Sequence, residues 1–260
     1  MKLIASDVDG TLVPVGTKDL TPAVFEMIEA CCAAGIHFVV ASGRPYPALR
    51  KAFEPVRDKV IFAADTGALV VYQEEVLYQS RIEPSLGGKI LEDIQARRGC
   101  EALVSAGPDA VIAQPKNWIF HLLLKRHMKG ALRTVRRWDE IKEEYQKISV
   151  YVRGGEESMV PVLKRLWEPE LLVMSAGGGW VDFCSGGKEA ALRAVMERLR
   201  IGADELTVFG DSENDMGMMR LAGQAYAMDS ALPEVKAVCG HTCATVPEVV
   251  MPMLREGGRL

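Results

Sequence analysis

Short apolar runs alternate with longer amphipathic stretches over the first 64 residues. Three runs have the length of buried strands: Leu3–Ala5, His37–Ala41 and Val60–Ala64. A helix is predicted after the first strand, where Thr21 and Pro22 suit an N-cap and first position and Gly35 suits the end. A second helix is predicted over Pro45–Phe53. This order predicts an α/β fold: a Rossmann-like parallel sheet with helices on both faces.

The same pattern returns near the C-terminus, after a middle of a different kind. The later part predicts helices over 188–199, 215–222, 233–238 and 247–254, with strands over 206–209 and 224–228. Residues 68–79 read as a hairpin that leaves the core. The segment between the N-terminal and C-terminal α/β parts, residues 83–181, has a different pattern. It is predicted to contain two helices, 84–98 and 158–167, and strands over 100–105, 111–113, 148–152, 171–175 and 180–184. We therefore predict a core made of residues 1–82 and 182–260, and an inserted α+β cap domain over 83–181.

Charge and composition exclude several classes of protein. The 260 residues carry a net charge of -4, which disfavours a nucleic-acid partner. No apolar stretch has the length of a membrane helix and no signal peptide is evident, so we expect a cytoplasmic protein without a membrane partner. The six cysteines have no regular framework and are interpreted as reduced thiols. The cluster Cys239, His241 and Cys243 lacks an evident fourth zinc ligand, so no metal is expected there.

Two carboxylates at the end of the first strand are the main chemical signal. Alternate strand residues point to opposite sides, so Asp7 and Asp9 share a side while Val8 turns away. Gly10 permits a sharp bend. Two carboxylates on one turn repel each other unless a cation lies between them, and Mg²⁺ prefers oxygen ligands. The pattern predicts a Mg²⁺ site with one nucleophilic or metal-binding carboxylate and one acid/base, although an ordinary Asp/Gly turn is the alternative.

Three later segments strengthen this prediction. Ser42-Gly43-Arg44-Pro45 follows the second strand, Lys188 follows Ser185-Gly186-Gly187, and Asp211, Asn214 and Asp215 follow the strand at 206–209. Together with Asp7-Val-Asp9-Gly-Thr, these motifs resemble those of the haloacid dehalogenase (HAD) superfamily, in its Cof-type IIB branch. They span residues 7 to 215. The resemblance implies a Rossmann-like core and a large cap between the second and third motifs.

The resemblance also assigns chemical roles. It implies that the Asp7 side chain, the Asp9 main-chain oxygen and Asp211 hold Mg²⁺. Asp7 would attack phosphorus to form an aspartyl-phosphate. Asp9 would protonate the leaving oxygen and then activate water.

Other motif residues are candidates for binding the phosphate. These are the Ser42 hydroxyl, the Gly43 N–H, Lys188 and Asn214. Asp215 is expected not to contact the phosphate directly. It would bind the metal through a water molecule or form an ion pair with Lys188. Two positions depart from the family pattern: Glu189 where a glycine is usual, and Asp65 where the branch often has asparagine.

The predicted function is a Mg²⁺-dependent phosphatase that hydrolyses small phosphorylated metabolites, with sugar phosphates favoured by the resemblance. A phosphomutase is the alternative, and its cap would need basic residues such as Arg126, Lys129, Arg133, Arg136 and Arg137. A phospho-accepting receiver module is disfavoured because receivers are about half this length and have no such insertion. A dinucleotide-binding fold is disfavoured because no Gly-x-Gly-x-x-Gly follows the first strand. The cap residues Trp118, His121, Arg126 and His127 are given no role.

Overall fold

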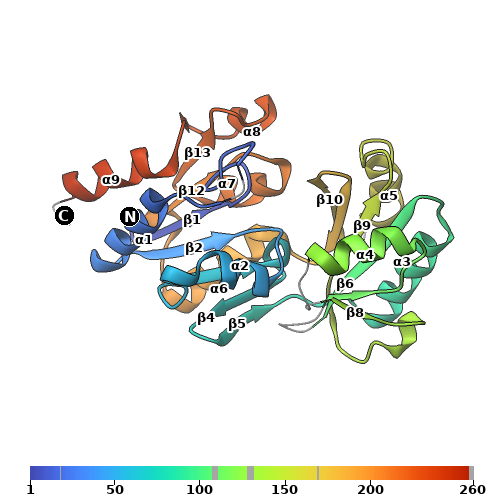
Figure 1. Ribbon diagram of the computed structural model, residues 1–260. Coiled ribbons are helices and arrows are strands. Elements are labelled where there is room, and N and C mark those ends of the chain that lie inside the picture. Colours follow the sequence, from blue (N-terminus) through green and yellow to red (C-terminus); the bar gives the residue numbers. More distant parts are fainter. Residues whose placement is uncertain (18, 107–110, 128–131, 169, 258–260) are drawn as a thin grey trace.

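The computed structural model describes residues 1–17, 19–106, 111–127, 132–168 and 170–257, which are built around two sheets. Figure 1 shows the larger sheet on the left, with both termini, and the smaller sheet on the right. The chain passes to the smaller sheet near residue 82 and returns after Cys184. We call the part around the larger sheet the core and the part around the smaller sheet the cap.

The core sheet has eight strands in the order β14-β13-β12-β1-β2-β3-β4-β5. Their bounds are β1 (Leu3–Ser6), β2 (His37–Ala41), β3 (Val60–Ala64), β4 (Leu69–Tyr72), β5 (Glu75–Gln79), β12 (Leu206–Gly210), β13 (Gln224–Met228) and β14 (His241–Cys243). Neighbours from β14 to β3 are parallel, and β4 and β5 are antiparallel. Because β1 lies between β12 and β2, segments far apart in sequence end at the same edge of the sheet.

Every residue of β1, β3 and β12 is buried, so both faces of this predominantly parallel sheet are covered, and helices provide most of the cover. They are α1 (Pro22–Ala33), α2 (Tyr46–Ala52), α6 (Gly187–Leu199), α7 (Met216–Leu221), α8 (Pro233–Ala237) and α9 (Val246–Glu256), with short 3₁₀ turns η1 (Glu54–Val56), η2 (Asp65–Gly67), η4 (Ala203–Glu205) and η5 (Glu213–Asp215). Helix α1 packs against α9, and α6 packs against α7. The aromatic side chains Phe38, Phe53 and Phe209 are fully buried in the core. The predicted α/β fold is confirmed.

Two details of the core differ from the sequence-based prediction. The hairpin over 68–79 does not leave the core, because β4 and β5 extend its sheet. Leu69, Val70 and Val71 of β4 are buried, and β4 and β5 pack against α6, which keeps the hairpin in place. Strand β14 was not predicted, since three residues are too few to show a periodicity.

The cap sheet has six strands in the order β10-β11-β9-β6-β7-β8. Their bounds are β6 (Cys100–Ala106), β7 (Val111–Ala113), β8 (Leu132–Thr134), β9 (Tyr145–Val152), β10 (Leu172–Gly177) and β11 (Trp180–Cys184). The sheet is antiparallel except for the pair β7 and β8. The helices are α3 (Pro84–Ala96), α4 (Trp118–His127) and α5 (Val160–Trp167), with η3 at Trp138–Glu140. Helix α4 was not predicted.

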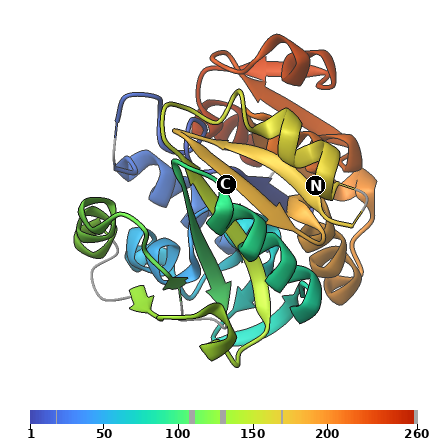
Figure 2. The same cartoon turned by 90° about the vertical axis from the view of Figure 1, so that its right-hand side faces the viewer.

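The two faces of the cap sheet differ in chemistry because successive strand residues point to opposite sides. One face is apolar and includes Val104, Ile148 and Phe183, which pack with α3 and α5. The alternating positions Ser105, Lys147, Ser149, Trp180 and Asp182 therefore belong to the opposite face. Figure 2 views the molecule from the cap side, with the cap strands in front of the core.

The domain division stays a prediction. All of β11 pairs within the cap sheet, which favours a second boundary after Cys184 rather than at residue 181. The described residues contain no helix that is both long and apolar enough to cross a bilayer.

Candidate active site

The motif residues meet at the carboxyl edge of the core sheet. Asp7 follows β1, Ser42 follows β2 and Asp211 follows β12, and these three strands are adjacent and parallel. A cavity of about 600 Å³ opens there, lined by Asp7, Asp9, Gly43, Asp211 and Asn214 on the core side. Ligands of open α/β sheets gather at this edge. The predicted convergence of these strand ends is what the structure shows.

A buried lysine is the electrostatic centre of the site. The Nζ of Lys188 donates to Asp7 Oδ1 at 2.5 Å and to Asp215 Oδ1 at 2.6 Å. All three residues are at most 5% exposed. Burial alone would lower the pKa of Lys188, but the two carboxylates outweigh it and raise the pKa above the ordinary lysine value. The raised pKa favours the charged form of Lys188 beside Asp7.

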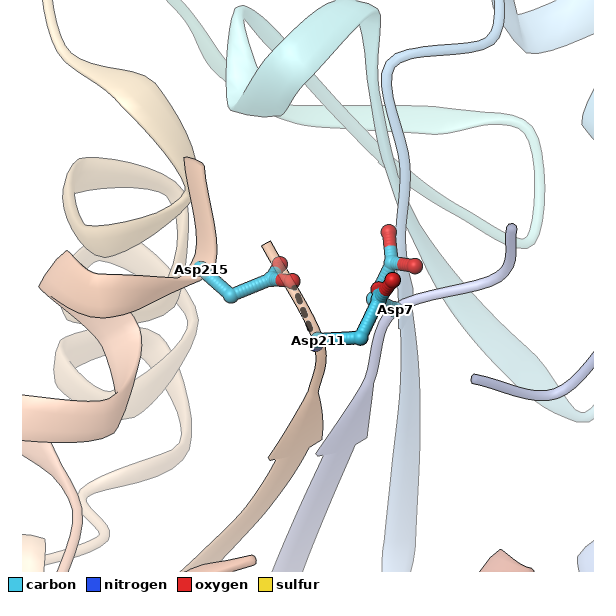
Figure 3. Close-up of side chains that lie close together, drawn as sticks. All are labelled: Asp7, Asp211 and Asp215. Atoms are coloured by element: carbon cyan, nitrogen blue, oxygen red, sulfur yellow. Dashed lines mark hydrogen bonds between the residues drawn. The ribbon is translucent and has the colours of Figure 1, made fainter. Parts of the chain in front are cut away.

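Asp215 is held on its other oxygen by the loop that contains Asp211. Its Oδ2 accepts from the backbone N–H of Asp211 at 3.0 Å and of Ser212 at 3.1 Å, and from the Ser212 hydroxyl at 3.2 Å. Figure 3 shows the first of these bonds as a dashed line. Asp215 thus joins Lys188 to the Asp211 loop, as one of the two sequence-based readings expected.

The carboxylates of Asp7, Asp211 and Asp215 present oxygen atoms that all lie within 4.8 Å of one another. Figure 3 shows them pointing toward a common space. Burial raises the pKa of Asp7 to about 8, and burial with the nearby Asp215 raises the pKa of Asp211 to about 6. Carboxylates this close resist ionisation unless a cation joins them, and hard oxygen donors suit Mg²⁺. Within the described part of the chain, no other group of three acidic, histidine or cysteine side chains comes together in this way.

Asp9 lies apart from this cluster. Its side chain is 57% exposed and pairs with Arg44, whose Nε donates to Asp9 Oδ2 at 2.8 Å and whose Nη2 donates to Oδ1. Both residues line the cavity. The sequence left the role of Arg44 open, and the structure makes it the partner of Asp9.

The remaining phosphate-binding candidates lie around the same cavity. The Ser42 hydroxyl is buried and accepts from the backbone N–H of Arg44 at 3.1 Å. Gly43 and Asn214 line the cavity, and Asn214 Oδ1 accepts from the Ser212 hydroxyl at 2.9 Å. The bond from Ser212 uses the amide oxygen of Asn214 and not its –NH₂ group.

The cap supplies the opposite wall, which sequence reasoning missed. Its polar members are Ser105, Lys147, Ser149, Ser175 and Asp182, and its apolar members include Leu103, Leu124 and Trp180. A signal was present: polar Lys147 and Ser149 alternate with apolar Ile148 and Val150, which is typical of a strand with one face turned to a polar site.

Other candidate residues stay outside the cavity. Trp118, His121 and Arg126 lie on α4 but do not line the cavity. Cys239 and Cys243 contact Met219 and Met228, while His241 stacks on Tyr226, so these three residues are used in packing. The side chain of His127 lies outside the described residues.

Comparison with known proteins identifies the family. A model of the haloacid dehalogenase-like hydrolases matches residues 4–250. The chain is 26% identical over 246 residues to the Escherichia coli K12 protein 5-amino-6-(5-phospho-D-ribitylamino)uracil phosphatase YbjI, covering 93% of this chain and 90% of that protein. It is 24% identical over 284 residues to phosphatase YwpJ of Bacillus subtilis, covering 95% and 96%.

Solved structures agree with this assignment. A crystal structure from Eubacterium rectale is 30% identical, with a TM-score of 0.85 and coverage of 98% of this chain and 99% of that one. A HAD subclass IIB sugar phosphatase is 22% identical, has a TM-score of 0.82 and matches both chains over their whole length, which shows a shared fold. The chain belongs to the haloacid dehalogenase-like hydrolases and is an enzyme of that class.

The first prediction concerns Gly10, whose backbone has φ +93°. A Cβ at this position would overlap Oδ2 of Asp211. Gly16 is a matched control, because it has φ +84° and nothing within 4 Å of a built Cβ. Gly16→Ala should lower the free energy of unfolding by roughly 1–2 kcal/mol through backbone strain alone. Gly10→Ala should cost more, because it also displaces Asp211, and should remove stabilisation by Mg²⁺ in thermal unfolding. Equal effects of the two variants would contradict this arrangement.

The second prediction concerns pH. The pKa of Asp7 rises from 3.8 to about 8 on folding, so between these values the folded protein binds more protons than the unfolded chain. The contribution of Asp7 to stability therefore falls as pH rises through this window, in the metal-free protein. Mg²⁺ favours the ionised carboxylates, so the rise in Tm caused by Mg²⁺ should be larger at pH 8 than at pH 5. The same rise at both pH values would show that these carboxylates do not hold the ion.

Proposed function

We propose that this enzyme is a Mg²⁺-dependent phosphatase that hydrolyses small phosphate esters, with sugar phosphates the favoured class, through an aspartyl-phosphate on Asp7. The observation that carries the proposal is the buried cation Lys188, which pairs with Asp215 and with Asp7, and Asp7 lines the cavity between the core and the cap. Phosphoryl transfer needs a positioned nucleophile and neutralised charge more than any other chemistry. The names of the curated relatives, which are phosphatases, support the same reaction class.

The residues around the cavity have two proposed roles, metal binding and phosphate binding. Asp7, Asp211 and the Asp9 main-chain oxygen would hold Mg²⁺, with Asp215 behind them. The ion supplies positive charge against the transferring phosphoryl oxygens. Ser42, the Gly43 N–H, Lys188 and the Asn214 amide would orient the phosphoryl group, placing phosphorus in line with Asp7.

The reaction has two displacements at phosphorus. An Asp7 oxygen forms a bond to phosphorus while the bond to the leaving oxygen breaks, and Asp9 gives that oxygen a proton. Water then attacks phosphorus, Asp9 takes a proton from it, and the bond to Asp7 breaks to release inorganic phosphate. Both carboxylate oxygens of Asp9 accept hydrogen bonds from Arg44, so the acid role requires this pair to open. We infer that an incoming phosphoryl group draws the Arg44 guanidinium away.

The charges of the cavity favour a phosphatase over a phosphomutase. Its described lining carries six carboxylates and two cations, Arg44 and Lys147, so a second phosphate would meet net negative charge. Two of the basic residues that a mutase would need are used elsewhere: Arg133 pairs with Glu143, and Arg137 pairs with Asp139. Lys129 lies outside the described residues.

The cavity wall also favours a polyol leaving group. Ser149 and Ser175 line the cavity together with the apolar residues Leu103 and Trp180. A sugar has hydroxyl groups at its edges and an apolar C–H face, which suits such a wall. The structural neighbour described as a sugar phosphatase has the same fold. Six free cysteines suit a reducing compartment, which supports a cytoplasmic enzyme.

The test is phosphate release from a sugar-phosphate set with Mg²⁺. Asp7→Asn removes the nucleophile at nearly constant shape, so kcat should fall at least about 10³-fold. Asp19→Asn, at an exposed loop position, is the matched control and should keep the wild-type rate. Excess chelator should stop turnover and added Mg²⁺ should restore it. Wild-type turnover by Asp7→Asn would disprove the covalent mechanism, and release of an isomer instead of phosphate would indicate a mutase.

A further inference from the structure

The turn η2 has an unusual backbone. Asp65, Thr66 and Gly67 follow β3 with φ of 51°, 60° and 84°, so three consecutive residues are left-handed and two of them are not glycine. Such a conformation is unfavourable for a β-branched residue like Thr66. It persists only where surrounding contacts enforce it, and such strain is common at functional sites. The contacts of this turn therefore indicate what it does.

On the core side, η2 contacts both parts of the proposed phosphate site. The Asp65 N–H donates to the Arg44 carbonyl at 3.0 Å, and the Thr66 N–H donates to the Ser42 carbonyl at 2.9 Å. Gly67 packs so closely that a Cβ would overlap the Gly187 carbonyl and the Lys188 Cα. The turn thus sets where the loop 42–44 and the start of α6 can lie.

On the cap side, the same turn is bound by buried polar groups. The Thr66 hydroxyl donates to Asp182 Oδ2 at 2.7 Å, and the Ser105 hydroxyl donates to Asp65 Oδ1 at 2.7 Å. Lys147 Nζ donates to Asp182 Oδ2 at 3.0 Å and to the Gly43 carbonyl at 2.9 Å, and lies 3.6 Å from Asp65 Oδ1. All five side-chain partners are at most 5% exposed. This cap–core network is formed by Asp65, Thr66, Ser105, Lys147 and Asp182.

Asp65, Ser105, Lys147 and Asp182 line the cavity, but their polar groups already bind one another, which argues against a direct role of the network in substrate binding. Two of the three Lys147 donors are used, and the third faces Asp65. Burial would lower the pKa of Lys147, but Asp182 and Asp65 outweigh it and raise the pKa, so the ammonium stays charged. Thr66 is 1% exposed and is not part of the cavity lining. Its hydroxyl can influence turnover only through the groups that it holds.

We infer that Thr66 and Lys147 are positioning residues: through η2, the cap network sets the geometry of the phosphate-binding loop 42–44 and of Lys188. The inference rests on the proposed function for its kinetic consequences. A cap seated on the core holds the loop and the lysine in place together. Because small displacements of groups around a reacting phosphoryl group are costly, the network should affect kcat more than KM.

Thr66→Val tests this with little change of shape, since it replaces the hydroxyl with a methyl group. Thr66→Ser keeps the hydroxyl and is the matched rescue variant. We expect Thr66→Val to lower kcat by about 10- to 100-fold with KM within about threefold, and Thr66→Ser to stay near wild type. The loss should be similar for p-nitrophenyl phosphate and for glucose 6-phosphate, because the phosphate site is shared by both.

Each other outcome overturns the inference. A lower Tm with unchanged kcat would make Thr66 merely structural. A rise of KM confined to glucose 6-phosphate would make the network part of the leaving-group site. Lys147→Met provides a second test and should reproduce the loss of kcat. Arg81→Met breaks an exposed pair with Glu144 beside the cap connection, and should leave kcat within about twofold.

Hydrogen exchange tests the coupling even if the wild type releases no phosphate. In Thr66→Val, amides of residues 42–44 and 186–189 should exchange faster than in Thr66→Ser, while those of β12 should not change. That result with an inactive wild type would reject the proposed function but keep the coupling. Unchanged exchange at 42–44 and 186–189 would reject the coupling itself.

Discussion

The site depends on one buried ammonium group. Lys188 lies fully inside the protein between Asp7 and Asp215, and removal of the lysine would leave two buried carboxylates without their cation. Asp7 belongs to the end of β1, Asp215 to the loop after β12, and Lys188 to the start of α6. The ion pairs therefore tie three segments, far apart in sequence, to one point at the edge of the sheet. The backbone N–H groups of Asp211 and Ser212 donate to Asp215, which extends the same constraint to the third carboxylate.

The cap contributes a second buried lysine, Lys147, which also lies beside two carboxylates. Lys147 faces Asp65 and Asp182 and reaches the Gly43 carbonyl, so charges from the cap and the core neutralise each other across their boundary. Both lysines border the strained turn η2: Gly67 packs on Lys188, while Thr66 and Lys147 share Asp182. The turn η2 therefore contacts both charge clusters of the site, the one around Lys188 and the one around Lys147.

Much of the core and its site was predictable from sequence. Asp7, Ser42 and Asp211 each follow an apolar strand, and parallel strands bring such positions to one edge, so their convergence required only local patterns. The pairing of Asp9 with Arg44 was not predictable, because it depends on side-chain directions in two loops. The cap wall was missed because antiparallel strands carry no comparable rule for which ends meet. Asp65 was noted only as a departure from the family pattern, and its partners Ser105 and Lys147 appear only in three dimensions.

The most direct test of the account is the stereochemical course at phosphorus. The wild-type enzyme would hydrolyse a thiophosphate ester made chiral with two oxygen isotopes, in water labelled with the third isotope, and the configuration of the released thiophosphate would be determined. Each in-line displacement inverts phosphorus, so attack by Asp7 followed by attack of water on the aspartyl-phosphate predicts net retention. Net inversion would mean that water displaces the leaving group in one step, and would contradict the role given to Asp7 beside Lys188.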